Sequence, residues 1–123
     1  MLAGHHRRAR GPRIDARLAA PGADWMRLGT DGIRRPDLRV TLATADGAVI
    51  LLSYDTALIR ASDLFLAALR DGTATAFDDQ YMRMAARFET GDPRYRWLTE
   101  SLFVGEGRLA GDHRIEYQIC RVG

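Results

Sequence analysis

The 123-residue sequence contains no lysine and no asparagine, and its only cysteine is Cys120. A single cysteine cannot form a disulfide within the chain, which is typical of proteins from a reducing compartment. All 18 basic residues are arginines, so an arginine here can stand where another protein carries lysine. A high arginine content is therefore a weak guide to function.

Long apolar runs are also missing. No run approaches the roughly 20 apolar residues that cross a bilayer, and residues 1–13 lack the apolar centre of a secretory signal. Charged residues make up 28% of the chain, a balance typical of a soluble globular protein. We therefore expect a cytoplasmic protein with no membrane partner.

The motifs of common metal, phosphate and dinucleotide sites do not occur. The three histidines and Cys120 are not spaced as zinc ligands are, and there is no P-loop, nucleophile elbow or dinucleotide fingerprint. We expect no metal and no cofactor. The formal net charge is only +2, with the basic excess in residues 1–13, so no nucleic-acid partner is expected.

Alternation of apolar and polar residues predicts strands along most of the chain. Ser62 and Gly72 are typical start and stop residues of a short helix over 62–71. The strands are expected at 13–19, near 25–28, in a hairpin over 37–54, at 80–89, and in a second hairpin over 101–109 and 113–122, with a helical turn at 95–98. The expected fold class is all-β, a mainly antiparallel barrel with one short helix.

We expect residues 11–123 to form this single barrel domain, preceded by a flexible arm rich in arginine and histidine over 1–10. A weaker hypothesis makes the arm a tether to nucleic acid or another anionic surface. Gly105 and Gly107, which lie inside a predicted strand, are interpreted as marking a bulge or a tight bend.

The strand expected at 80–89 has two different faces, because successive side chains point to opposite sides of a sheet. One face carries Tyr81, Arg83, Arg87 and Glu89, and the other carries Met82, Met84, Ala86 and Phe88. In most antiparallel sheets the apolar face fills the interior and the charges are solvated. The polar face can instead line a barrel cavity, and the sequence leaves both arrangements open.

Four stretches resemble the bacterial and fungal family catalogued as domain of unknown function 3237. They are ADW at 23–25, DLRVTLATADGA at 37–48, YMR at 81–83 and RFETGDPRYRWLTESLFVGEG at 87–107. The resemblance starts at about Gly11 and implies an eight-stranded antiparallel barrel of the allene oxide cyclase-like group. Relatives in that group include cyclases and dirigent proteins that bind apolar small molecules in the lumen. The pattern matches at Asp24, Trp25, Asp37, Arg39, Tyr81, Arg83, Phe88, Glu89, Tyr95 and Trp97.

The sequence departs from the family where one or two strands usually precede the position of Gly11. Seven strands do not close an eight-stranded wall, so an edge would be left open. Either the natural protein begins earlier, or a second subunit covers the gap, or the barrel is partly open. A homo-oligomer is therefore one of the expected arrangements.

Two functional hypotheses follow. In the first, the barrel is a cyclase, isomerase or dehydratase acting on an apolar or aromatic small molecule, with Glu89 as acid or base, Arg83 and Arg39 stabilising negative charge, and Tyr81 donating a proton. The second is a carrier of lipocalin-like type without chemistry. In both, the ligand-binding residues are expected to be Trp25, Asp24, Asp37, Tyr54, Phe88, Tyr95 and Trp97.

Overall fold

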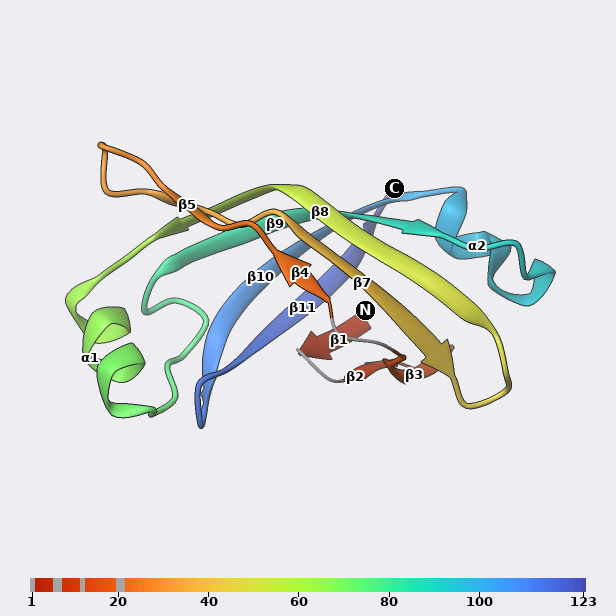
Figure 1. Ribbon diagram of the computed structural model, residues 1–123, viewed down its shortest axis with the longest axis horizontal. Coiled ribbons are helices and arrows are strands. Elements are labelled where there is room, and N and C mark those ends of the chain that lie inside the picture. Colours follow the sequence, from red (N-terminus) through yellow and green to blue (C-terminus); the bar gives the residue numbers. More distant parts are fainter. Residues whose placement is uncertain (1, 6–7, 12, 20–21) are drawn as a thin grey trace.

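Eight strands form a closed ring in the computed structural model, which describes residues 2–5, 8–11, 13–19 and 22–123 (Figure 1). Neighbouring strands are antiparallel, and the pairing of β7 with β8 joins the two ends of the curled sheet. Around the ring the order is β7 (Leu38–Thr44), β3 (Ile14–Leu18), β2 (Arg8–Gly11), β1 (Leu2–His5), β11 (Arg114–Val122), β10 (Leu102–Gly111), β9 (Tyr81–Glu89) and β8 (Val49–Arg60). The expected all-β, mainly antiparallel fold is confirmed.

β1 and β2 lie where the sequence predicted a flexible arm. β1 pairs with β11 from Leu2, opposite Ile119, to His5, opposite Glu116, while β2 pairs with β3. Without these two strands, β11 and β3 would each present a row of unpaired N–H and C=O groups. The prediction that the N-terminal strands are missing is therefore wrong. Backbone pairing holds this segment, and its arginine and histidine content gave no sign of that.

Three short strands extend the ring. β4 (Ala23–Asp24) pairs with β7 beyond the end of β3, and β5 (Arg27–Leu28) forms a hairpin with β6 (Arg34–Arg35), which joins β8. This hairpin projects from the barrel (Figure 1). The Asp31 carboxylate holds its turn by accepting hydrogen bonds from the Ile33 N–H and the Arg35 guanidinium. The strand expected near 25–28 is thus present as β5.

Helical segments lie at the two ends of the barrel (Figure 1). α1 (Asp63–Asp71) begins after Ser62, whose side chain accepts a hydrogen bond from the Phe65 N–H, and ends at Gly72 with a φ of 71°. At the other end, η1 (Pro93–Tyr95) leads into α2 (Arg96–Thr99). The predicted helix and the predicted helical turn are both confirmed. Among the described residues, no helix is long and apolar enough to span a membrane.

Apolar side chains fill the part of the interior that the structure describes. Along β9 the buried residues alternate strictly with exposed or half-buried ones, and Phe88 meets Phe103 edge-to-face with ring centroids 5.1 Å apart. Burial of each large apolar side chain contributes about 1.5–3 kcal/mol. Other members of this core include Leu42, Ile50, Ile59, Met82, Met84, Leu109 and Ile119. The arrangement with the apolar faces inside is therefore the one adopted.

Gly105 and Gly107 make room for this core. The pairing of β10 with β11 runs without a shift from Leu102 to Leu109, so neither glycine marks a bulge. A Cβ atom on Gly107 would lie 2.7 Å from Tyr117 Cε1 and 2.9 Å from the Met82 side chain. Glycine is required there because larger side chains approach the backbone closely.

We predict that Gly107→Ala lowers the free energy of unfolding by about 1–3 kcal/mol, the usual cost of overpacking a core. Urea denaturation followed by circular dichroism measures the change. Gly91→Ala is the matched control, because a Cβ there meets no atom within 4 Å. Equal stability of the two variants would contradict the close packing at Gly107.

Candidate functional site

The predicted catalytic residues lie on the outside of the barrel. The Glu89 side chain is 60% exposed and that of Arg83 is 39% exposed. Met82 and Met84, which alternate with these residues, are buried in the core. Arg39, on β7, is also exposed. The prediction of a lumenal Glu–Arg–Tyr set is therefore wrong, because the hydrophobic effect places the apolar face of β9 inside.

Arg83 and Glu89 are also too far apart to act together. Residue 89 lies six positions after residue 83 on the same strand, which corresponds to about 20 Å. Glu89 forms an ion pair with Arg87 at 3.7 Å, whereas Arg83 forms one with Glu106 at 3.4 Å. The structure does bring Tyr81 and Arg83 together, since the Arg83 guanidinium carbon lies 5.0 Å from the centre of the tyrosine ring.

Three of the predicted ligand-binding aromatics belong to the packed end of the barrel near α2. Phe88 is a core residue, and Trp97 packs against Phe103 with ring centroids 6.4 Å apart. The guanidinium of Arg13 covers the Trp97 ring at 4.0 Å. Tyr95 is buried and takes part in a polar network. These rings pack at one end of the barrel, near α2.

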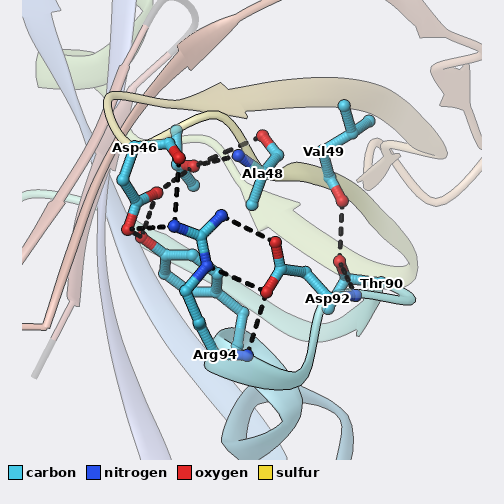
Figure 2. A network of polar contacts seen from close by, with 8 residues as sticks. Asp46, Ala48, Val49, Thr90, Asp92 and Arg94 are labelled. Carbon is cyan, nitrogen blue, oxygen red and sulfur yellow. Dashed lines mark hydrogen bonds and ion pairs between the residues drawn. The ribbon is translucent and has the colours of Figure 1, made fainter.

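Figure 2 shows that network, which fastens the loop before η1 to the turn between β7 and β8. The Tyr95 hydroxyl donates to the Asp46 carboxylate, with oxygen–oxygen distances of 2.8 and 2.9 Å. The Arg94 guanidinium donates to the Asp46 carbonyl oxygen and, through two nitrogens, to the Asp92 carboxylate. Asp92 also accepts from the Arg94 N–H. With these mutual contacts, the network locks one end of the barrel.

Both carboxylates of the network are held in their ionised form. Hydrogen bonds from Arg94 hold the pKa of Asp92 below its usual range. Hydrogen bonds from Thr44 and Tyr95 lower the pKa of Asp46. A carboxylate whose pKa is lower in the folded protein stabilises the fold above the unfolded pKa, about 4, and loses that contribution as the pH falls.

We predict that Asp92→Asn makes the free energy of unfolding less dependent on pH between about pH 5 and pH 3. Asparagine is as good a helix cap as aspartate, so the substitution removes the charge and retains the cap. Denaturant titrations at several pH values measure the slope. Asp78→Asn, at an exposed loop carboxylate outside the network, should leave the slope unchanged.

A second polar group faces the interior at the end of the barrel opposite the Asp46 turn. Asp24 pairs with Leu38, and Leu38 pairs with Tyr54 on its other side. Paired residues in antiparallel strands share one face, so the Asp24 side chain lies on the same face as the buried Tyr54. Tyr117 meets Tyr54 edge-to-face, with ring centroids 5.6 Å apart. We call Asp24, Tyr54 and Tyr117 the mouth cluster.

The electrostatics of the mouth cluster keep both phenols protonated. Burial is the largest cause that raises the pKa of Tyr54 and of Tyr117, and the negative charge of Asp24 raises both further. Next to the cluster, Asp24 Oδ1 accepts a hydrogen bond from the Asp37 N–H at 3.2 Å. Asp37 Oδ1 is buried and makes no hydrogen bond with any described residue.

Three predicted ligand-binding residues, Asp24, Asp37 and Tyr54, therefore lie together here. Trp25 follows Asp24 in the chain and is largely exposed. Tyr117 was missed, although its alternation with Ile115 and Ile119 places a phenol on an apolar face and could have indicated it. No three His, Cys, Asp or Glu side chains of the described residues come close enough to hold a metal ion.

Residues 5–122 match the family described as "Protein of unknown function (DUF3237)". A UPF0311 protein of Rhodopseudomonas palustris strain TIE-1 is 30% identical over 104 residues, which cover 84% of this chain and 67% of the relative. A UPF0311 protein of Bradyrhizobium diazoefficiens is 30% identical over 91 residues, covering 74% of this chain and 59% of that protein.

Two solved structures are similar to the whole barrel. One is a conserved protein of unknown function from Rhodopseudomonas palustris, with a TM-score of 0.81, 26% identity, and coverage of 94% of this chain and 76% of the other. The other is a β-barrel-like protein from Acinetobacter baumannii, with a TM-score of 0.74, 27% identity, and coverage of 94% and 73%.

Proposed function

The chain belongs to the DUF3237 family, and we propose that it binds an apolar or aromatic small molecule at the mouth cluster without transforming it. The observation that carries this proposal is the inward-facing row of Asp24, Leu38 and Tyr54 beside Tyr117. Ligand sites are typically apolar pockets with a few polar groups that converge and fix orientation. The resemblance to allene oxide cyclase-like barrels supports binding of an apolar small molecule in the lumen by analogy.

The cluster fits a ligand with an apolar body and one hydroxyl or amine group. The Asp24 carboxylate is an acceptor at the rim, and the two phenols supply ring faces and hydroxyl groups. A ligand group that donates a hydrogen bond would pair with the Asp24 carboxylate.

Packing below the cluster limits the size of the ligand. The contacts of Tyr117 and Met82 with the Gly107 backbone leave too little room there for even a methyl group. Barrels of eight strands are either filled by side chains or hold one small ligand. We therefore infer that a molecule of one or two rings binds above the tyrosine pair.

Binding without chemistry is favoured over catalysis by the protonation of the phenols. A general acid works best when its pKa lies near the working pH, whereas burial raises the pKa of Tyr54 and Tyr117 above their ordinary value. Glu89, the acid expected from the sequence, lies on the outer face. A carrier is therefore the better interpretation, and a cyclase, isomerase or dehydratase is not needed to explain the site.

We predict that 1-naphthol binds more tightly than naphthalene, which has no hydroxyl to donate to Asp24. Asp24→Asn should weaken 1-naphthol binding about fivefold, because a hydrogen bond to a charged acceptor is worth about 1 kcal/mol more than one to a neutral acceptor. The same variant should leave naphthalene binding unchanged. Fluorescence titration measures both affinities.

Glu89→Gln is the control, because it removes a carboxylate from the outer face of the same barrel. Equal effects of the two substitutions on 1-naphthol binding would contradict the mouth cluster as the site. Native mass spectrometry of protein purified from its own host complements the probe. Absence of both saturable 1-naphthol binding and any retained molecule would overturn the proposal.

A further inference from the structure

The outer face of β8 to β11 carries a hollow of about 810 Å³. One row across these four strands forms the middle of its floor, since the register aligns Thr56, Ala85, Val104 and Cys120. All four side chains are small or medium-sized, and they form a shallow, largely apolar strip. The neighbouring row supplies the polar rim, in which Arg83 is paired with Glu106.

Two apolar side chains protrude beside the hollow. Leu102 pairs with Val122 in the row next to Val104 and Cys120, and their exposed fractions are 74% and 51%. Val104 is itself 49% exposed. Contiguous apolar groups of this kind on a protein surface mark interaction sites. The hollow and its protruding neighbours therefore form one patch, which we call the outer patch (Leu58, Ala85, Leu102, Val104, Cys120 and Val122).

We propose that the outer patch binds a second copy of this chain in a twofold-symmetric dimer. In such an interface the same surface occurs on both subunits, so it must be complementary to itself. The outer patch meets this requirement because it carries both a hollow and adjacent protruding side chains. Leu102 and Val122 of each copy can enter the hollow over Ala85 of the other.

The charges around the outer patch favour the same occupant. Arg83 and Glu106 form an ion pair on one side of it, and Arg87 and Glu89 form another farther along β9. Each copy thus presents both signs, which a second copy can match in antiparallel orientation. A strongly anionic or cationic partner would meet like charges as well as opposite ones.

A small molecule fits the outer patch less well than a second copy. A ligand confined to the hollow would cover Ala85 and Val104 but leave Leu102 and Val122 in water. A protein surface covers both parts. The proposal is independent of the mouth cluster, because the outer patch and the mouth cluster lie on opposite faces of the barrel wall.

Sedimentation equilibrium of the full chain tests the dimer. We expect the wild-type protein to be dimeric at about 10 µM, within the range of modest interfaces, and Val104→Arg to be monomeric with an unchanged circular dichroism spectrum. Leu64→Arg on α1 is the matched control, because Leu64 is 61% exposed but lies outside the outer patch. This control should remain dimeric.

A monomeric wild-type protein at about 100 µM would overturn the proposal, because the affinity of the two copies would then be weaker than that of a specific interface. Dissociation of the Leu64→Arg variant, or persistence of the Val104→Arg dimer, would overturn it too by assigning the contact to another surface. Should Val104→Arg fail to fold, Leu102→Glu decides, because the exposed Leu102 side chain tolerates a charge. Native mass spectrometry can also show a monomer that retains a small molecule. If the Val104→Arg variant no longer retains that molecule, the hollow is a ligand site and the dimer proposal is overturned.

Discussion

Closure of the sheet by backbone pairing is the constraint on which the rest of the structure depends. Once β7 pairs with β8 and β1 pairs with β11, the curled sheet has an inside and an outside. Every second side chain must then enter a narrow interior, where unpaired charges are costly. Closure therefore sorts the residues of each strand into core and surface, and it decides which polar groups can meet a molecule in the lumen.

The mouth cluster shows how a polar group enters that interior. β3 and β4 both pair with β7, one after the other, with a break between them. After the break, Asp24 falls on the inner face at the rim, where water still reaches its carboxylate. Tyr54 and Tyr117 are buried, and their rings pack edge-to-face. At the other end, the polar network around Asp46 and Arg94 ties the loop before η1 to the turn between β7 and β8.

Local signals in the sequence were sufficient for most of the fold. The cap at Ser62, the stop at Gly72 and the alternation along residues 81–89 each depend on neighbouring residues, and each is found in the structure. Alternation separates two faces of a strand but cannot say which face turns inward, so Glu89 and Arg83 were placed in a lumen. The spacing alone shows that Arg83 and Glu89 are too far apart for one site, because six positions along a strand span about 20 Å.

The features that sequence could not supply depend on pairing between distant segments. β1 is recognised only through its register with β11, and Tyr117 becomes a site residue only because Tyr54 lies opposite it. The sequence named Asp24 and Tyr54 only as separate candidates. The row that joins them through Leu38 depends on the register of three strands.

The pairing of β1 with β11 also governs when the barrel can be completed. Residues 2–5 find their partners only at residues 116–119, so the ribosome must release nearly all of the described chain before the ring can close. Contacts of such long sequence separation slow folding, because the loop entropy is lost before the contact forms. Until residues 116–119 have emerged, the nascent chain therefore carries open strand edges.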